Sequence, residues 1–285
     1  MLALACPVCR QPVHAETLAC KQGHAYEQRD GMLVLLTPQF AAKLNAFTQA
    51  FQADRSAQHY PTLPHTAYAQ LPFGDAVRND PEWRARQYDL RLILNLLPKD
   101  KAMRVLDVGA WNGWLSHQLA THGHAVTAVA YFADEQDGLG ARKFYPNPQW
   151  QAVQLDECDL DVIRDEFDCV ILNRCVQFAP DPLRQVQAAQ AHVAKGGLLI
   201  VTGMNIFKDP AKQVVRTQQR AAAFKQQHGL ELFLRPTRGY LDVHDVARFQ
   251  STGLSVKPYR TMWRAIVKSL LQPTSPRPCY GVWRR

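Results

Sequence analysis

The sequence predicts an α/β fold in which a doubly wound, mostly parallel sheet follows a small metal-binding ribbon. Strand-like and helix-like segments alternate after residue 101, a glycine-rich turn follows the first strand, and two ligand-like pairs lie near the N-terminus. At 285 residues, the chain exceeds a typical domain of about 150 residues. The predicted parts are a ribbon (1–39), a helical connecting region (40–100) and the α/β domain (101–285), with its core at 101–203 and a basic segment at 204–285.

Two pairs of residues predict a structural zinc site in the ribbon. Cys6 and Cys9 are separated by two residues, and Cys20 and His24 by three. Such pairs on tight turns can complete a tetrahedral site, and four protein ligands leave no open position to activate water. The ribbon is too small for a core of its own, so bound metal would supply its folding energy. The alternative is three reduced cysteines beside a surface histidine.

The segments around these ligands predict short strands and two helices. Alternating residues favour strands at 13–15 and 31–36. Apolar residues at three- and four-residue spacing favour a helix within 40–60. Asp80 followed by Pro81 is typical of a helix start, and the apolar positions that follow would pack this second helix on the sheet.

Composition favours a soluble cytoplasmic protein. No apolar run reaches the roughly 18 to 20 residues that span a membrane, and the N-terminus lacks the features of an export signal. Seven cysteines, an odd number, favour reduced thiols. Outside the predicted zinc site, four of them are expected to be buried: Cys158, Cys169, Cys175 and Cys279.

The net charge of +8 lies in the C-terminal part of the chain. Residues 1–203 contain 18 Lys and Arg against 21 Asp and Glu, whereas residues 204–285 contain 15 against 4. This segment could attract an anionic metabolite, RNA or an acidic partner, or form a solvated basic face. Four arginines there are candidates for contact with an anionic substrate: Arg235, Arg238, Arg260 and Arg264.

The sequence of the core, residues 101–203, predicts five parallel strands that bind ligands at their carboxyl ends. Asp107-Val-Gly109-Ala-Trp111-Asn-Gly113 forms the turn after the first strand, where Gly109 would allow close approach of a ligand. Helices are expected at 114–120, 182–194, 210–228 and 240–250. The expected strands are 105–108, 125–130, 149–155, 167–172 and 197–202, with an antiparallel edge pair at 254–256 and 279–283.

These motifs resemble class I S-adenosylmethionine-dependent methyltransferases over residues 101–203. The matching elements are Asp107, Gly109 and Gly113, Asp156 before Phe167-Asp168, and Lys195-Gly-Gly197. The sequence is also similar to a bacterial subgroup with a zinc ribbon, in its Tyr68–Phe73, Trp111–Ser116 and Asp137-Gly-Leu-Gly-Ala141 elements. The ribbon resembles that of large-subunit rRNA guanine methyltransferases, which raises RNA as an acceptor.

The resemblance implies S-adenosylmethionine as cofactor and a set of residues that would bind it. These are Asp107, Gly109, Ala110, Trp111, Gly113, Tyr131, Asp156, Glu157 and Asn173. Asn173 and Gln177 are candidates for orienting the methyl acceptor or taking its proton, and Asn173 could instead cap a turn.

The sequence departs from the family pattern at the predicted cofactor site. Trp111 replaces a glycine and would crowd the methionine part of the cofactor. Ala130 replaces the acid that binds the ribose hydroxyls, unless Asp134 or Glu135 substitutes for it. The leading hypothesis is a methyltransferase with an unidentified acceptor, an organic anion or RNA. The alternatives are a non-catalytic binding or scaffold protein, and an RNA clamp.

Overall fold

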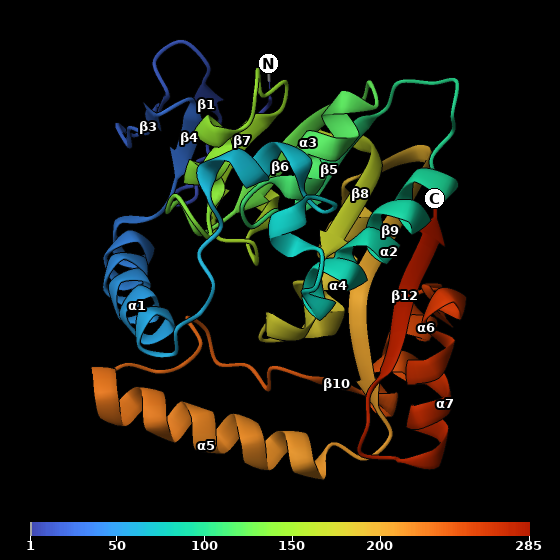
Figure 1. Cartoon of the computed structure of the whole chain (residues 1–285). Helices are drawn as coiled ribbons and strands as arrows, with labels where there is room; N and C mark the ends of the chain where they lie inside the picture. The colour runs from blue at the N-terminus through green and yellow to red at the C-terminus, as the bar shows by residue number, and fades with distance from the viewer. Residues whose placement is uncertain (1) are drawn as a thin grey trace.

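A mostly parallel sheet with helices on both faces forms the centre of the molecule (Figure 1). The computed structural model describes residues 2–285 and confirms the predicted α/β class. Its strands are β1 (Val13–His14), β2 (Ala19–Cys20), β3 (Glu27–Arg29), β4 (Met32–Leu35), β5 (Arg104–Val108), β6 (Ala125–Ala130), β7 (Gln151–Leu155), β8 (Phe167–Asn173), β9 (Val193–Phe207), β10 (Leu241–Asp242), β11 (Ser255–Pro258) and β12 (Arg277–Arg284).

Within residues 2–285, seven α-helices and several short 3-10 helices connect these strands. The α-helices are α1 (Pro38–Ala57), α2 (Pro81–Leu96), α3 (Trp114–Thr121), α4 (Pro182–Ala191), α5 (Ala211–His228), α6 (Val243–Ser251) and α7 (Trp263–Leu271). The 3-10 helices are η1 (His65–Gln70), η2 (Asp75–Val77), η3 (Leu139–Phe144), η4 (Leu160–Val162), η5 (Val176–Phe178) and η6 (Arg260–Met262). Asp80 caps α2 as predicted, since its carboxylate accepts the backbone N–H groups of Glu82 and Trp83.

The strand order of the large sheet is β11-β12-β9-β8-β5-β6-β7-β4-β3, with β10 beside β9. The chain moves from β5 to β6 on one side and later returns to β8 on the other. Ligands of open α/β sheets bind at the carboxyl ends of the strands, where the order reverses in this way. The topology therefore places the expected site at the ends of β5 and β8.

Strand residues alternate between two cores. In β8, Cys169 and Ile171 face the layer that contains α2 and α3, whereas Val170 and Leu172 face the layer that contains α4 and α6. Successive strand residues point to opposite faces, so a strand buried on both sides reads as a continuous apolar run. That pattern makes β8 a central strand.

The second half of the predicted ribbon extends the large sheet. β1 pairs with β2, as a small ribbon requires, but β4 lies parallel to β7 and carries β3 at the sheet edge. Leu35 and Met32 of β4 are buried in this edge. The ribbon around β1 lies at the end of the sheet opposite α5 (Figure 1).

The antiparallel edge pair is confirmed, and several expected boundaries shift. β12 pairs antiparallel with both β9 and β11. α4 ends at Ala191, and β9 begins at Val193 instead of residue 197 because that strand pairs with β8 from Phe167 onward. The helix expected from residue 240 begins at Val243, since the preceding Leu241–Asp242 pair lies beside β9.

Two of the four expected buried thiols are exposed to solvent to some degree. Cys169 and Cys279 are buried, but Cys158 is exposed and Cys175 is partly exposed. Cys158 lies in the loop after β7, where the chain leaves the core, and an apolar neighbourhood in the sequence did not reveal this. None of the helices in residues 2–285 has the length and apolar character needed to cross a lipid bilayer.

Helices α1 and α5 pack together over the carboxyl ends of the strands (Figure 1). Phe47 of α1 contacts Phe224 of α5, with ring centroids 6.2 Å apart. Asp54 of α1 is only 2% exposed and forms an ion pair with Arg220 of α5. The Asp54 carboxylate also accepts a hydrogen bond from Gln58 at 2.9 Å. Helices α1 and α5, which are far apart in sequence, together form what we call the cover.

We expect Asp54→Asn to lower the free energy of unfolding by about 1–3 kcal/mol, because it leaves Arg220 without its buried anionic partner. Urea denaturation measures this change. The matched control is Asp75→Asn, whose pair with Arg78 is exposed on both sides and is worth less than about 1 kcal/mol. Equal effects of the two substitutions would contradict a special role of Asp54 in the cover.

Candidate functional site

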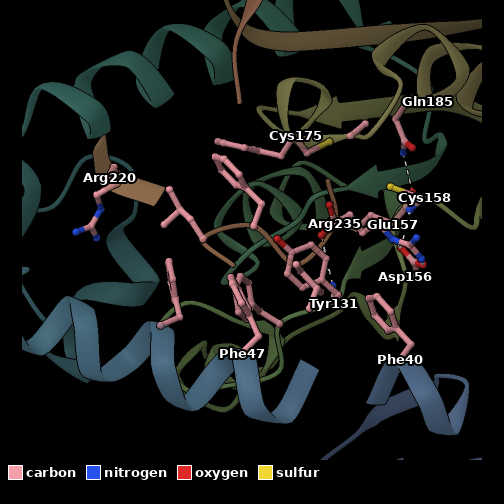
Figure 2. Close-up of a pocket in the computed structure, with 17 residues that line it drawn as sticks. Phe40, Phe47, Tyr131, Asp156, Glu157, Cys158, Cys175, Gln185, Arg220 and Arg235 are labelled. Carbon is pink, nitrogen blue, oxygen red and sulfur yellow. Dashed lines mark hydrogen bonds and ion pairs between the residues drawn. The ribbon is translucent and has the colours of Figure 1, made fainter. Parts of the chain in front are cut away.

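Two adjoining cavities lie at the carboxyl ends of the parallel strands. The first, which we call the aromatic cavity, has a volume of about 350 Å³ and is drawn in Figure 2. The second, the arginine cavity, has a volume of about 410 Å³. Three arginines, Arg55, Arg86 and Arg174, line the arginine cavity. Six residues line both cavities: Phe51, Tyr131, Phe132, Glu157, Cys175 and Phe178.

The cover forms one wall of the aromatic cavity. Phe40 and Phe47 project from α1 toward Tyr131 in Figure 2. Phe132 stacks on Phe47 and Phe51 at centroid distances of 6.0 and 5.3 Å. Tyr131 and Phe132 therefore pack in the cluster that contains α1, and they also line both cavities.

The glycine-rich turn has the positive φ angles that its glycines predict. Gly109 has φ +75°, and a Cβ atom there would lie 2.6 Å from the Cβ atom of Cys175. At Gly113, with φ +81°, a Cβ atom would lie 2.5 Å from the Trp150 ring. Both contacts are closer than carbon atoms tolerate, so packing within the chain requires glycine at both positions. Gly109 also lines the arginine cavity, whereas Gly113 does not.

Trp111 forms a wall of the arginine cavity and leaves it open. Its φ angle is +52°, which is uncommon for a residue other than glycine. The indole stacks on Trp83 of α2 at 5.5 Å, and its Nε1 donates a hydrogen bond of 3.1 Å to Asp137. Asp137 in turn pairs with Arg55 at 2.9 Å. These contacts hold the Trp111 side chain against α2, so the crowding predicted from the sequence does not close the cavity.

Asp107 lies beneath the turn. It is fully buried and accepts a hydrogen bond of 2.6 Å from Ser116 of α3. Burial raises the pKa of Asp107 to about 7, although the Ser116 hydroxyl favours the ionised form. Asp107 holds the turn against α3, and together with Ala110 and Gly113 it is absent from the walls of both cavities. Direct cofactor contact by these three predicted residues has no support in the geometry.

Glu157 brings a carboxyl group to the end of β6, where Ala130 supplies none. The backbone N–H of Tyr131, which follows Ala130, donates to Glu157 Oε1 at 3.4 Å. Burial raises the pKa of Glu157 to about 8, with a smaller contribution from the Asp107 carboxylate, while the Tyr131 N–H lowers it. Glu157 lines both cavities and lies at their junction.

The two acids considered as substitutes for Ala130 have other partners. Asp134 accepts the backbone N–H groups of Gln136 and Asp137, at 2.9 and 2.7 Å. Glu135 forms an exposed ion pair with Lys143. Neither acid lines the two cavities. The geometry therefore gives no support to the hypothesis that Asp134 or Glu135 replaces the missing acid.

Two of the four arginines proposed for an anionic substrate form ion pairs within the chain. Arg235 pairs with Asp156, with Nε 3.1 Å from Oδ1, at the aromatic cavity (Figure 2). Arg238 pairs with Asp242 and Asp245. Arg260 and Arg264 line neither cavity. Asp156 also lines the aromatic cavity, but its carboxylate is already engaged by Arg235.

Buried polar atoms without hydrogen-bond partners gather at this end of the sheet. Among residues 2–285, they include Asn173 Oδ1, Gln177 Oε1 and Arg86 Nε, which belong to residues that line the arginine cavity. Buried polar groups are almost always paired, so this cluster sets the region apart from the rest of the core. The candidates Asn173 and Gln177 line the same cavity. Arg86 and Arg174 were missed because arginine on a helix or in a loop is usually a surface residue.

The four predicted metal ligands converge in the ribbon. One ligand atom from each of Cys6, Cys9, Cys20 and His24 lies within 4.8 Å of the other three. The Cys9 and Cys20 sulfur atoms are 3.6 Å apart, and His24 Nδ1 lies 3.4 Å from Cys20 Sγ. Zinc–sulfur bonds of about 2.3 Å in a tetrahedron imply a sulfur–sulfur separation of about 3.8 Å. The cluster therefore has the donor set and the size of a tetrahedral metal site.

Part of the chain is similar to curated methyltransferases. A ubiquinone biosynthesis O-methyltransferase from Coxiella burnetii is 29% identical over 109 residues, which cover 37% of this chain and 45% of the relative. The protein of the same name from Colwellia psychrerythraea is 24% identical over 162 residues, covering 55% of this chain and 65% of the relative. The match thus spans about half to two thirds of these relatives.

Solved structures of methyltransferases resemble the chain more distantly. An S-adenosylmethionine-dependent methyltransferase from Mesorhizobium loti has a TM-score of 0.47 and 17% identity, covering 73% of this chain and 99% of that one. The plantazolicin methyltransferase BamL has a TM-score of 0.46 and 11% identity, covering 86% of this chain and 98% of that one.

A family model gives the assignment. The model described as a methyltransferase domain matches residues 82–233, from the start of α2 to the segment that follows α5. This range contains the parallel strands β5 to β9, the glycine-rich turn and most residues of the arginine cavity. Because the match covers more than half of the 285 residues, the chain belongs to the methyltransferase domain family.

Proposed function

We propose that this protein transfers a methyl group from S-adenosylmethionine to an acceptor bound in the arginine cavity. The observation that carries the proposal is the pair of joined cavities at the switch point of a methyltransferase-domain sheet. Glu157, at the junction, and the unpaired oxygens of Asn173 and Gln177 supply hydrogen-bonding groups that suit the cofactor and the acceptor. The residues present therefore fit the cofactor.

The aromatic cavity is suited to the adenine of the cofactor, since Tyr131, Phe132 and Phe178 offer flat apolar surfaces. Gly109, which has no side chain, allows the methionine part to approach the turn. The cofactor supplies a methyl group bound to a positively charged sulfur. The aromatic side chains of α1 and α5 give this region an apolar wall.

When bound, S-adenosylmethionine would supply its methyl group to an oxygen or nitrogen of the acceptor and would leave as the neutral thioether S-adenosylhomocysteine, while the acceptor would give up a proton. The amide side chains of Asn173 and Gln177 line the cavity and are the groups that would orient the acceptor by hydrogen bonding. An amide is a poor base, so positioning would account for most of the acceleration and the proton would pass to solvent.

We propose that Glu157 binds the ribose hydroxyls of the cofactor in place of the acid missing at Ala130. Its carboxyl group reaches the end of β6 from β7, and the Tyr131 N–H holds one oxygen there. The other oxygen, Oε2, has no hydrogen-bond partner within residues 2–285. A carboxylate can accept hydrogen bonds from two neighbouring hydroxyls. The ribose site would thus be supplied by the neighbouring strand.

At pH 9, where the carboxylate is ionised, we expect Glu157→Gln to weaken binding of S-adenosylhomocysteine about tenfold, because it removes a charge-assisted hydrogen bond. Calorimetric titration measures the loss. The control is Asp134→Asn, an acidic residue of the adjacent loop outside the cavities. A double-mutant cycle with adenosine and 2′,3′-dideoxyadenosine isolates the ribose. If Glu157→Gln discriminates between these nucleosides as well as the parent protein does, Glu157 is not the ribose ligand.

The raised pKa of Glu157 predicts a pH dependence of binding. The carboxyl group is neutral below a pKa of about 8 and ionised above it. Only the ionised group accepts from both ribose hydroxyls, so the affinity for S-adenosylhomocysteine should rise from pH 7 to 9 and level off. The raised pKa also lowers the free energy of unfolding as the pH increases from about 4.5 to about 8, because the folded state binds the proton more tightly than the unfolded state does. Glu157→Gln should flatten the binding profile.

The proposed function is tested by titration of the zinc-replete protein with S-adenosylmethionine and S-adenosylhomocysteine. We expect micromolar dissociation constants and thermal stabilisation by both ligands. No binding of either compound at millimolar concentration would overturn the proposal and favour a non-catalytic binding or scaffold protein. In a second step, tritium from the labelled methyl group should appear in small-molecule or RNA fractions of a cell extract.

We further propose that Cys6, Cys9, Cys20 and His24 hold a structural zinc ion. Three thiolates and one imidazole are a donor set that zinc prefers, and all four positions are filled by protein. The Tyr26 hydroxyl lies 2.8 Å from Cys6 Sγ and can donate to the ligand from outside the site. A reduced zinc site is consistent with the cytoplasmic location that we propose for this protein.

The Asp137–Ala141 element supports the proposed assignment to the bacterial subgroup with a zinc ribbon. Asp137 fixes Trp111 and Arg55 at the arginine cavity. Gly138 and Gly140 allow the chain to pack on the loop at 132–134, where a Cβ atom would overlap backbone atoms. The element thus serves as a support for the cavity wall.

RNA is a second proposed acceptor class, suggested by the basic segment 204–285. If RNA is the acceptor, the protein should bind it at low ionic strength, and added salt should weaken that binding.

A further inference from the structure

Two arginines from distant parts of the chain line the same wall region of the arginine cavity. Arg86 comes from α2, and Arg174 directly follows β8. Arg86 is only 9% exposed, and the side chain of Arg174 is 22% exposed. Arginine is rarely buried to this degree without an anionic partner for its planar group of donors.

The donors of Arg86 are incompletely satisfied. Its guanidinium lies 4.9 Å from the Trp83 ring centroid and 4.7 Å from that of Trp111. One terminal nitrogen donates to Glu82 at 3.2 Å, and the Glu82 side chain is 63% exposed. The buried Nε has no partner among residues 2–285. Burial, together with the nearby Arg174, lowers the pKa of Arg86, so a bound anion would stabilise the charged form of its guanidinium.

Arg174 is held in place from behind. One of its terminal nitrogens donates to Asp89 of α2 at 2.6 Å, and Asp89 also accepts from the Tyr259 hydroxyl. Gly203 makes room for the side chain, since a Cβ atom there would lie 2.5 Å from Arg174 Cγ. One nitrogen of this guanidinium is thus bound to Asp89, and the Arg174 side chain lines the cavity.

The rest of the arginine cavity combines aromatic and polar side chains. Of its acids, Asp137 pairs with Arg55 and Glu82 pairs with Arg86. Trp111, Tyr60 and Phe178 line it, and the last two are 43% and 47% exposed. Gln177 and Asn205 add polar groups on the side of β8 and β9. A ligand that fits this wall has a planar apolar body and one anionic group.

We propose that Arg86 and Arg174 form a carboxylate-binding subsite and that the methyl acceptor is an aromatic or similarly flat organic acid. This inference rests on the proposed function, because the acceptor must lie beside the cofactor. Forked guanidinium donors match the two oxygens of a carboxylate. The carboxylate would take the terminal nitrogen of Arg86 that does not bind Glu82 and a donor of Arg174 that does not bind Asp89, and the ring would lie against Trp111.

The subsite is tested with benzoate and benzyl alcohol as probes of the full-length protein saturated with S-adenosylhomocysteine. We expect benzoate to bind, and Arg86→Lys and Arg174→Lys each to weaken it about tenfold while benzyl alcohol binding is unchanged. Lysine keeps the charge but loses the fork. Arg84→Lys, an exposed change on the same helix, is the matched control. No benzoate binding by the parent protein would overturn the proposal.

A second arm separates the acceptor from the amino-acid carboxylate of the cofactor. S-adenosylhomocysteine carries that carboxylate, and 5′-methylthioadenosine lacks it. If Arg86→Lys and Arg174→Lys weaken only S-adenosylhomocysteine and leave benzoate unchanged, the arginines bind the cofactor and the proposal is wrong. Failure of the parent to bind either nucleoside would refute the proposed function, whereas benzoate binding measured without nucleoside still reports on the subsite. Thermal midpoints of the variants show whether each remains folded.

Discussion

Replacement of Cys20 by serine is expected to reduce bound zinc from about one ion per chain to none and to unfold the N-terminal ribbon. The ribbon around β1 and β2 has few buried apolar residues, so the metal would supply its stability. It also contacts η4 of the α/β domain, because the Ala5 N–H donates to the Val162 carbonyl at 2.7 Å. We therefore expect a lower thermal midpoint and rapid proteolysis within the ribbon, measured with metal analysis on the same sample.

The matched control for this prediction is His14→Ser. His14 is exposed on β1 of the same ribbon and lies outside the cluster of ligand atoms. This variant should keep its zinc and its resistance to protease. If Cys20→Ser retained a full equivalent of zinc, the site would not be the one described. The interpretation as three reduced cysteines beside a surface histidine would hold if the parent protein, purified without chelator, contained no zinc.

Gly140→Ala is expected to lower the free energy of unfolding by about 3 kcal/mol and to weaken binding of S-adenosylhomocysteine. A Cβ atom at this position would overlap the carbonyl oxygen of Ala133 and lie 2.9 Å from that of Asp134. Backbone atoms in a packed loop cannot move aside as a flexible side chain can. The loop would have to shift, and with it Asp137, which holds Trp111 and Arg55 at the arginine cavity.

Gly123→Ala is the control for that substitution. Gly123 has φ +86°, and a Cβ atom there would meet no other atom within 4 Å. Alanine at this position therefore costs only the strain of a left-handed backbone, about 1–2 kcal/mol. Its ligand affinity should be unchanged, because it lies in the turn between α3 and β6, outside both cavities. Unchanged affinity in Gly140→Ala would show that the loop does not support the cavity.

The candidate site was only partly predictable. Patterns of adjacent residues correctly placed Gly109, Asn173 and Gln177 at one cavity, since each follows or ends a strand whose carboxyl end faces the site. Asp107 carried the same kind of signal, but its side chain points into the core toward Ser116. The direction of a side chain at a strand end depends on the packing of the next helix, which a motif does not contain.

Long-range pairing decided the electrostatics of the site. The sequence shows 15 basic residues after residue 203, yet Arg235 and Arg238 are neutralised by acids of the loops and helices beside them. Arg86 and Arg174 are distant in sequence but line the same cavity, although nothing in their local sequence marks them. A charge count gives the sign of a segment, whereas the partner of each charge depends on the folded chain.

Local sequence was sufficient to predict the α/β class, the parallel strands β5 to β9, the helix start at Asp80 and the four converging ligands of the ribbon. These features follow from periodicity, capping and spacing, which act over a few residues. Three other features arise from tertiary contacts alone: β4 joins the large sheet, Glu157 reaches the end of β6, and α1 and α5 cover the cavities. Those contacts join residues far apart in the chain, and they form where burial and charge pairing in the folded protein favour them.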